Sequence, residues 1–235
     1  GDQIRDLTGK LGLEDRYHDG LRITDAATAE AVLMVLGGQV NRQLVAELGK
    51  HDVQATGLTG ADGQTFSAAP LQRDKVDLGF VGSVHRVQSA LVDTLLASDI
   101  VPVIATVAPL DTDLAGNREH FYNINADHCA GPLAEALGAD TLLFLTNVTG
   151  VLDADQQRIS QLNPQACAEL RSSGTIHGGM IPKVETCLNA VRGGVDAAVI
   201  LDGRVPHALL LEIFTEHGVG TLIRDTTNRK RRGSG

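Results

Sequence analysis

The sequence predicts an α/β fold with a mainly parallel β-sheet. Apolar, strand-like runs alternate along the chain with segments whose apolar residues recur every three or four positions, as they do in amphipathic helices. The strand-like runs are rich in Val, Ile and Leu without polar alternation, which is typical of strands covered on both faces. The clearest runs are residues 100–107, 141–148, 197–201 and 220–223, and residues 54–58 are a further candidate.

Composition excludes several classes of function. With 235 residues, of which 43% are hydrophobic, the chain can bury a sizeable core as one large domain or two lobes. Aromatic residues make up only 3% and the net charge is −9, so we expect no nucleic-acid partner. No apolar run approaches the roughly 20 residues needed to cross a bilayer, so we expect no membrane partner. Three widely spaced cysteines indicate neither zinc nor disulfides; they predict a reducing, cytoplasmic compartment and no protein-bound metal.

The two ends of the chain are unusual. Gly1 is followed directly by a polar segment, with no initiator Met and no leading strand, so we expect that the chain starts within a longer polypeptide. The basic run from Arg229 to Arg232 precedes Gly-Ser-Gly. Residues 228–235 therefore predict a disordered tail or an expression remnant.

The first candidate binding residue is Arg22. The segment from His18 to Asp25 predicts a loop that carries Arg22 into a long helix, and arginine is the natural bidentate clamp for a carboxylate. The alternative, which the isolated segment favours, is a surface salt bridge between Arg22 and Asp19 or Asp25.

A long amphipathic helix is predicted from about Asp25 to Gly49. Its apolar stripe, at positions 33, 36, 40, 44 and 48, is wider than one buried face requires. Gly37 and Gly38 each cost about 0.5–1 kcal/mol relative to alanine within a helix, and a close helix–helix approach would offset that cost. We therefore expect a subunit contact, as in a two-fold dimer. The alternative is a helix buried in a large core.

Further along the chain the pattern changes twice. Between Asp62 and Val84, short pieces separated by glycines predict a β-hairpin excursion from the sheet. Near Gly138, between a predicted helix and the strand that begins at Thr141, the sequence predicts a boundary between two lobes.

Two polar segments follow predicted strands. In residues 123–127, Asn125 is expected to be a helix N-cap and Asp127 a first-turn acid that complements the helix dipole. Three polar groups at such a position would equally suit a ligand site. The second segment, residues 145–151, contains Gly150, which would let the backbone approach a nucleotide.

Lys183 is the leading candidate for phosphate chemistry. It follows Gly178 and Gly179 in the predicted first turn of a helix, where the helix dipole disfavours a lysine unless an anion binds nearby. Backbone N–H groups, a glycine pair and a lysine together predict a phosphate site. The alternative is a solvated surface lysine. The chain contains neither of the glycine-rich phosphate motifs Gly-x-x-x-x-Gly-Lys-Ser/Thr and Gly-x-Gly-x-x-Gly.

Taken together, these segments resemble the acetylglutamate kinases of the amino acid kinase family. The resemblance runs from Gly1 to about Ile223 and depends on the order and spacing of six segments, residues 19–25, 57–63, 79–82, 122–127, 178–184 and 202–212. It implies a three-layer αβα sandwich that transfers the γ-phosphoryl group of ATP to the side-chain carboxylate of N-acetyl-L-glutamate. It also implies that residues 1–138 bind the acetylamino acid and dimerise, with a hexamer as the alternative, and that residues 139–227 bind ATP.

The resemblance assigns roles to individual residues. Arg22 would clamp the substrate α-carboxylate, and Asn123, Asn125 and Gly1 would also bind the substrate. Lys183 would stabilise the migrating phosphoryl group, and Asp127 would orient the catalytic lysines. The nucleotide would be lined by Asn147, Val148, Thr149, Gly150, Val151, Leu152, Thr175, Ile176 and His177. Mg²⁺ would be held mainly by ATP phosphates and water.

Two departures from the family pattern affect these expectations. Asn147 stands where the family usually has Asp. The family's first strand, which carries a second catalytic lysine, is not present, and Gly1 resembles the last glycine of the turn that follows it. We therefore expect this chain alone to be inactive.

Two other functions remain open. A non-catalytic arginine-sensing domain is one, because Glu212 and Gly218 in the C-terminal segment resemble the arginine site of feedback-inhibited relatives. An amino acid kinase that acts on another acidic substrate is the other.

Overall fold

The computed structural model describes residues 1–73, 76–215 and 218–225. Contacts divide the chain into two compact units, Gly1–Cys129 and Ala130–Gly235, called unit 1 and unit 2 below. The sequence placed the lobe boundary near Gly138, just after helix α5 (Ala126–Ala136), whereas the division by contacts falls within that helix. The basic run from Arg229 to Arg232 lies outside the described residues.

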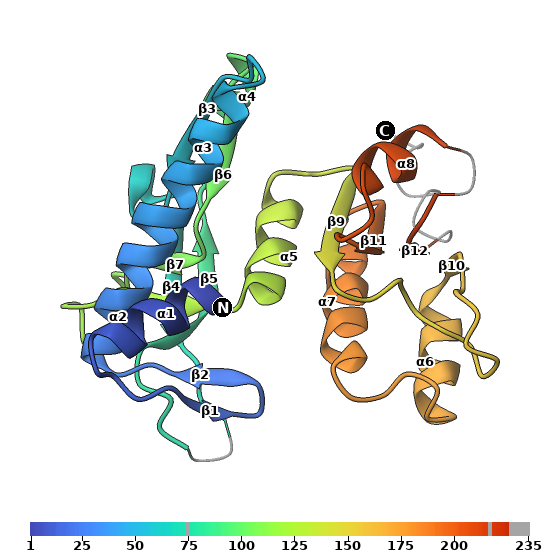
Figure 1. The fold of residues 1–235 in the computed structure, drawn as a ribbon, viewed down its shortest axis with the longest axis horizontal. Helices are drawn as coiled ribbons and strands as arrows, with labels where there is room; N and C mark the ends of the chain where they lie inside the picture. Colours follow the sequence, from blue (N-terminus) through green and yellow to red (C-terminus); the bar gives the residue numbers. More distant parts are fainter. Residues whose placement is uncertain (74–75, 216–217, 226–235) are drawn as a thin grey trace. The chain divides into compact units, whose positions relative to one another are not determined.

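The described part of unit 1 contains three small sheets (Figure 1). The largest has the strand order β4-β5-β8-β7, in which β5 and β8 are parallel. Strands β3 and β6 form a parallel pair, and β1 and β2 form a hairpin. The predicted excursion is confirmed, because β4 and β5 pair antiparallel. The strands are β1 (Arg16–His18), β2 (Leu21–Ile23), β3 (Ala55–Leu58), β4 (Phe66–Pro70), β5 (Val81–Val87), β6 (Val101–Ile104), β7 (Val107–Ala108) and β8 (Tyr122–Ile124).

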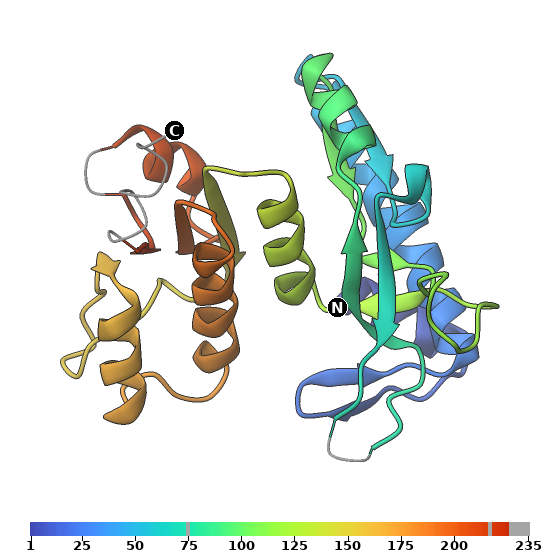
Figure 2. The same cartoon turned by 180° about the vertical axis from the view of Figure 1, so that it is seen from behind.

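The predicted long helix forms, but its middle is not α-helical. Three segments follow one another without a break in helical backbone (Figures 1 and 2): α2 (Ala26–Leu33), the π-helical η1 (Met34–Val40) and α3 (Asn41–Gly49). The π-helical segment contains Gly37 and Gly38, which weaken the regular α-helical preference. The other helices of unit 1 are α1 (Asp2–Lys10), the 3₁₀ turn η2 (Asp62–Gln64) and α4 (Ala90–Ala97).

This long helix is buried along one side only. Val32 and Val35 are each 1% exposed and pack in a core cluster with Ile4 from α1. Met34 and Leu44, in contrast, are 58% and 51% exposed. The alternative of a helix enclosed in a large core is therefore wrong for the described chain, and an apolar flank remains at the surface.

Unit 2 is a layered α/β structure. Its sheet has the order β10-β12-β11-β9, in which β9 and β11 are parallel over six residue pairs. Alternate residues of β11 face opposite layers: Ala198 and Ile200 pack against α6 and α7, and Val199 and Leu201 pack against α8. The elements are β9 (Thr141–Thr146), β10 (Gln161–Leu162), α6 (Pro164–Ser172), α7 (Met180–Arg192), β11 (Ala197–Asp202), α8 (Ala208–Phe214) and β12 (Thr221–Ile223).

Coverage of the strands differs from the prediction in one respect. All but the first residue of β11 are buried, as the unbroken apolar run predicts. In β9, however, Thr141 is exposed and Leu145 is 52% exposed. The reason is position, since β9 is the edge strand of this sheet and, within the described residues, pairs with β11 alone. Apolar composition alone does not distinguish an edge strand from a central one.

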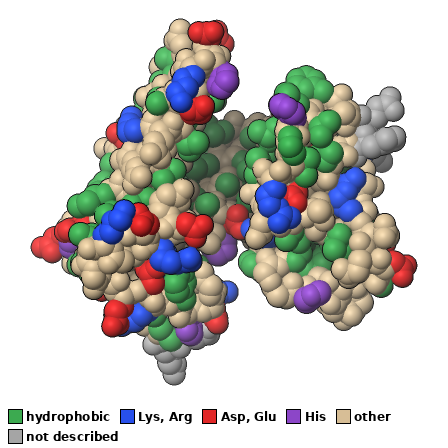
Figure 3. Space-filling view, in the orientation of Figure 1, with side chains coloured by type: hydrophobic (Ala, Val, Ile, Leu, Met, Phe, Trp, Pro, Cys, Tyr) green, Lys and Arg blue, Asp and Glu red, His purple; other side chains and the backbone are tan. Residues whose placement is uncertain are grey.

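Helix α8 presents apolar side chains to the surface of unit 2. Figure 3 shows hydrophobic side chains gathered over this helix. The exposed residues are Leu209, Leu210, Leu211, Ile213 and Phe214. Among the described helices, none combines the length and the apolar character needed to cross a membrane.

The three cysteines, Cys129, Cys167 and Cys187, are buried and are not joined in disulfides. Burial penalises the charged thiolate, so it raises the pKa of Cys129 to about 12 and that of Cys167 to about 11. Both groups are therefore neutral at physiological pH.

Candidate active site

Arg22 lies in strand β2, not in the loop that the sequence predicted. The strand exists because Asp19 and Gly20, with φ of 46° and 78°, form the two-residue turn of a hairpin with β1. Arg22 is directly opposite Tyr17 across the hairpin, and its guanidinium carbon lies 4.9 Å from the centre of the Tyr17 ring. Only 9% of Arg22 is exposed.

The ion-pair partner of Arg22 is Asp15, not Asp19 or Asp25. Arg22 Nη1 pairs with Asp15 Oδ1, and the buried hydroxyl of Thr8 donates to the same oxygen over 3.1 Å. Asp15 thus joins helix α1 to the hairpin and holds the guanidinium in place. Asp25 instead caps α2, because its carboxylate accepts from the Thr28 N–H over 2.9 Å; this bond lowers the pKa of Asp25.

Asn123 lies next to the segment that follows Arg22. It is the central residue of β8, and its Nδ2 donates to the Thr24 hydroxyl over 3.5 Å, a long contact. Thr24 is fully buried and forms an isolated parallel β-bridge with Gly79, two residues before β5. The fold of unit 1 therefore gathers residues from three distant parts of the sequence, and Thr24 is a member that the sequence analysis did not identify.

The N-cap prediction for the next helix is confirmed. Asn125 Oδ1 accepts from the Asp127 N–H over 2.9 Å, which satisfies one backbone donor in the first turn of α5. Asp127 is in that turn, where a carboxylate complements the helix dipole. Gly1 is the exposed N-cap residue of α1, and a Cβ atom there would meet nothing within 4 Å. Its role in substrate binding remains a prediction.

Lys183 lies in the first turn of α7, as predicted, and is partly buried. Gly178 has a φ of +54° and forms the turn that leads to Gly179, the N-cap. A Cβ atom on either glycine would meet nothing within 4 Å, so the space beside the helix start is open. The N–H groups of Met180 and Ile181 donate over 3.2 Å each to carbonyl oxygens of the preceding turn, so they are engaged rather than free.

The predicted nucleotide segment after β9 turns sharply toward β12. Gly150 has a φ of +131°, and a Cβ atom there would lie 2.5 Å from the Thr221 hydroxyl oxygen. Val151 is 1% exposed, and its N–H donates to the same hydroxyl over 2.9 Å. Asn147 and Thr149 are exposed. The Val151 carbonyl oxygen also accepts from the Ile159 N–H over 2.9 Å, so both polar backbone groups of Val151 are engaged within the protein and its side chain is buried.

The second predicted nucleotide segment precedes α7. Ile176 is 3% exposed within the core of unit 2, whereas His177 is exposed and its Nδ1 lies 3.0 Å from the Thr175 carbonyl oxygen. Figures 1 and 2 show that the loop before α7 is at the same end of unit 2 as the C-terminal end of β9. The fold thus brings both segments that the sequence predicts for the nucleotide, together with Lys183, to one edge of the sheet, the edge at which open α/β proteins bind ligands.

A charged pair at this edge was missed by the sequence analysis. Asp202 ends β11, and the guanidinium of Arg204 donates two hydrogen bonds to its carboxylate over 2.9 and 2.7 Å. These bonds, with one from the Arg204 backbone, lower the pKa of Asp202 to about 2. Gly203 between them donates to the Thr146 carbonyl of β9 over 2.8 Å. The pair therefore lies beside the segment that begins at Asn147.

Glu212 and Gly218, the predicted effector residues, lie together. Glu212 Oε2 accepts from the N–H groups of Val219 and Gly220 over 2.7 and 2.8 Å. Gly218 has a φ of +55°, and a Cβ atom there would be 2.6 Å from the same oxygen. Both residues line a cavity of about 810 Å³, to which Arg158 also contributes.

Among the residues that the structure describes, no cluster of three or more His, Cys, Asp or Glu side chains is arranged to hold a metal ion.

Comparisons with known proteins agree with one another. The profile of the amino acid kinase family matches residues 1–202. An acetylglutamate kinase from Brucella abortus (strain S19) is 48% identical over 233 residues, which cover 95% of this chain and 77% of that protein. The acetylglutamate kinase of Rhizorhabdus wittichii is 47% identical over the same length and is covered to 75%.

Solved structures share the fold. The protein smu.665 from Streptococcus mutans UA159 superposes with a TM-score of 0.77 and 27% identity, covering 95% of this chain and 82% of that one. An N-acetylglutamate synthase from Neisseria gonorrhoeae, complexed with coenzyme A and N-acetyl-glutamate, has a TM-score of 0.79 and 23% identity, covering 94% of this chain and 49% of that one. A Giardia carbamate kinase has a TM-score of 0.65 and 12% identity, covering 96% and 81%.

Proposed function

The chain belongs to the amino acid kinase family, and we propose from this membership that it acts as an acetylglutamate kinase. Its reaction transfers the γ-phosphoryl group of ATP to the side-chain carboxylate of N-acetyl-L-glutamate, a step of arginine biosynthesis. The observation that carries the proposal is 48% identity to an acetylglutamate kinase over 95% of this chain. Cytoplasmic location is part of the proposal, because three cysteines without disulfides fit a reducing compartment.

The chemistry explains why the chain needs no general base for this reaction. A carboxylate acceptor is already ionised at pH 7, so no proton has to be removed. Phosphoryl transfer then requires positioning and positive charge around the migrating group. Lys183 supplies that charge in our proposal, from a helix start that has open space beside it. The positive end of the α7 dipole adds to it.

Substrate recognition is proposed for unit 1. Arg22 binds the α-carboxylate of N-acetyl-L-glutamate. Other parts of the same substrate are bound by Asn123, Asn125 and Gly1. The burial of Arg22 supports this role, because a charge with little access to water interacts strongly with an incoming carboxylate. Asp15 must then share the guanidinium with the substrate. Asp127 orients Lys183 in the proposal.

Nucleotide binding is proposed for unit 2. ATP binds at the edge of the sheet lined by residues 147–152 and 175–177, and Mg²⁺ on its phosphates neutralises part of their charge. The open glycine pair before α7 and the exposed Asn147 and Thr149 fit such a ligand. The side chains of Val151 and Ile176 are in the core, so these two residues contribute to the shape of the site.

Two further partners belong to the proposal. The first is a second copy of the chain, packed against the exposed flank of the long helix, where Met34 and Leu44 are exposed and a Cβ atom on Gly38 would meet nothing within 4 Å. The second is arginine as a feedback inhibitor in the cavity beside Glu212 and Gly218. A hexamer is the alternative assembly.

An ATP-coupled hydroxamate assay tests the function. Turnover is measured on the polypeptide as its gene encodes it, with N-acetyl-L-glutamate, glutamate and aminoadipate as competing acceptors. We expect a clear preference for N-acetyl-L-glutamate. Equal use of glutamate or aminoadipate would contradict the substrate assignment, and arginine binding without any turnover would support a sensor instead.

A further inference from the structure

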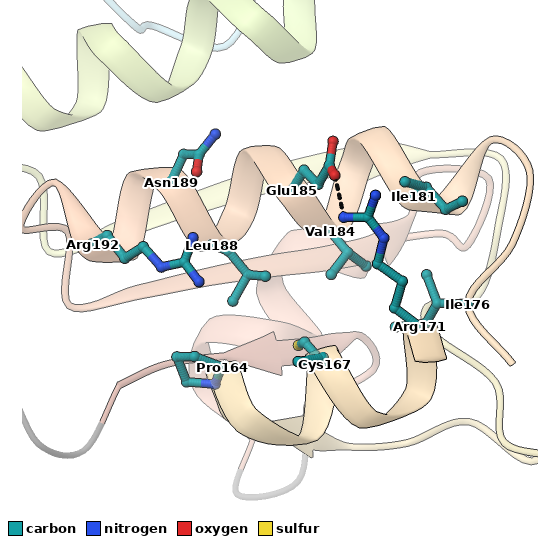
Figure 4. Close-up of a pocket in the computed structure, with 11 residues that line it drawn as sticks. Pro164, Cys167, Arg171, Ile176, Ile181, Val184, Glu185, Leu188, Asn189 and Arg192 are labelled. Atoms are coloured by element: carbon teal, nitrogen blue, oxygen red, sulfur yellow. Dashed lines mark hydrogen bonds and ion pairs between the residues drawn. The ribbon is translucent and has the colours of Figure 1, made fainter. Parts of the chain in front are cut away.

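Helices α6 and α7 enclose a groove that has no part in the function proposed above. The groove has a volume of about 320 Å³, within the range of sites for small organic ligands. Figures 1 and 2 show the two helices side by side, and Figure 4 shows the residues between them. Of the residues proposed for nucleotide binding, only Ile176 lines the groove.

The floor of the groove is apolar. Val184 and Leu188 project from α7 toward Cys167 and Pro164 on α6 (Figure 4). Cys167 and Val184 are 1% and 4% exposed. Because burial raises the pKa of Cys167 to about 11, its thiol is neutral and the floor carries no negative charge. This surface would accept a hydrocarbon group.

The two ends of the groove differ in charge. At one end Arg171 pairs with Glu185, so the two charges offset each other. At the other end is Arg192, which forms no ion pair within residues 1–73, 76–215 and 218–225. The groove therefore combines a neutral end with a cationic end.

The orientation of Arg192 is informative. It lies in the last turn of α7, where a cation complements the helix dipole. Figure 4, however, shows the guanidinium beside Leu188, above the groove and directed back along the helix. Its charge is also close enough to Cys167 to oppose in part the effect of burial on the pKa of that thiol. A favourable interaction with the helix dipole explains why a cationic residue is at position 192, but it does not explain why the side chain of Arg192 is directed back toward the groove.

We propose that the groove between α6 and α7 binds a small amphipathic carboxylate. The carboxylate pairs with Arg192, whose planar fork matches its two oxygens. The hydrocarbon body lies on Cys167, Val184 and Leu188. A second charged group on the ligand is not needed, because Arg171 and Glu185 already satisfy each other.

Methyl NMR with octanoate as the probe tests the proposal. The 235-residue chain has a mass of 24.8 kDa, so methyl resonances of Val184 and Leu188 can be followed during a titration. We expect saturable shifts of these methyl groups with octanoate. Octanol, which has the same body without the charge, should bind at least about tenfold more weakly, on the scale of one lost charge-assisted hydrogen bond. Absence of saturable shifts at both residues would overturn the proposal.

Two variants and a control separate charge from shape. Arg192→Gln should weaken octanoate binding at least about tenfold, because it removes the cation but keeps most of the side chain. Ala168→Phe changes an exposed residue that lines the groove, and should block binding by filling it. Arg5→Gln removes an exposed arginine of α1 and should leave binding unchanged. Equal affinity of the wild-type chain and Arg192→Gln for octanoate would contradict the assignment, as would undiminished binding in a folded Ala168→Phe chain.

Discussion

Arg22 and Asp15 form an ion pair in which only 7% of the arginine side chain and 18% of the aspartate side chain are exposed. The pair joins the β1–β2 hairpin to helix α1, since Thr8 of α1 donates to the same carboxylate. An incoming carboxylate would therefore meet an Arg22 guanidinium that already forms an ion pair with Asp15. We therefore expect the pair to stabilise the free protein and, in the proposed function, to compete with the substrate carboxylate for Arg22.

Asp15→Asn should lower the free energy of unfolding by about 1.5–3 kcal/mol, the cost of losing a hydrogen bond to a charged group. The same change frees Arg22 from its neutralising partner, so N-acetyl-L-glutamate should stabilise the variant more than it stabilises the wild type. Urea unfolding with and without the ligand measures both effects. Asp19→Asn has a matched change of charge but lies at the exposed turn of the hairpin, and should alter neither quantity. If N-acetyl-L-glutamate stabilised Asp15→Asn and the wild type equally, the proposed role of Arg22 in substrate binding would be contradicted.

Lys183→Ala should lower turnover by about 10²–10³, on the scale of removing one electrostatic stabiliser of the transition state. The affinity for ATP should change less, because the proposed role of Lys183 is to stabilise the phosphoryl group during its transfer. Steady-state kinetics on the polypeptide as its gene encodes it provide the measurement. Lys50→Ala removes an exposed lysine paired with Glu47 and is the control. Near-normal turnover in Lys183→Ala would contradict the proposed role of Lys183 in catalysis.

Asn123→Ala and Asn125→Ala should both raise KM for N-acetyl-L-glutamate, because both residues bind the substrate in our proposal, but they should differ in stability. Asn125 also caps α5, so its loss should cost about 0.5–2 kcal/mol of stability. Asn123 makes only a 3.5 Å contact with Thr24, so its loss should raise KM with little change in stability. Thermal unfolding and kinetics distinguish them. A stable Asn123→Ala enzyme with unaltered KM would exclude Asn123 from substrate contact.

Acid stability should depend on Asp202. Hydrogen bonds from Arg204 lower the pKa of Asp202 to about 2, below the value near 4 of an unfolded aspartate. A lowered pKa stabilises the folded state above the unfolded value, and this contribution is lost as the pH falls from about 4 to 2. Arg204→Gln should therefore reduce stability at pH 7 and flatten its decline below pH 4. Urea unfolding at pH 2.5 to 5 provides the comparison, and parallel pH profiles for both proteins would contradict this account.

Gly218→Ala should be more destabilising than Gly138→Ala. Both glycines have a positive φ, +55° and +60°, so alanine costs about 1–2 kcal/mol at either site. At Gly138 the new methyl group meets nothing within 4 Å, whereas at Gly218 it would lie 2.6 Å from Glu212 Oε2. The Glu212 carboxylate would have to move and release the N–H groups that it accepts from. Equal losses of stability in the two variants would show that Glu212 adapts freely.

Regular elements were predictable where one local pattern decides the outcome. The three- and four-residue spacing around Lys183 predicted α7, and the unbroken apolar run predicted β11. The environment of Arg22 was not predicted, because it depends on the packing of α1 against a hairpin. One local signal was available, since Asp19-Gly20 is a favoured pair for a two-residue hairpin turn. Recognising it would have put Arg22 opposite Tyr17.

Other features depend on which chain segments become neighbours. Leu145 belongs to an apolar run like that of β11, and only the strand order reveals that its strand is at an edge. The sequence shows that Arg204 is two residues from Asp202. It does not show that the pair lies beside the end of β9, which follows from the hydrogen bond between the Gly203 N–H and the Thr146 carbonyl oxygen. The proposed roles of Arg22, Asn123 and Lys183 rest on a family resemblance, and the fold adds the burial and the neighbours of each side chain.

The buried thiols of Cys129 and Cys167 have a practical consequence. A thiol reagent attacks the thiolate, and each of these groups is shielded from solvent and has a raised pKa. Alkylation of the native protein should therefore require a transient opening of the chain. The rate at which a thiol reagent modifies these sulfur atoms therefore reports how often the surrounding structure opens, without an added dye or label.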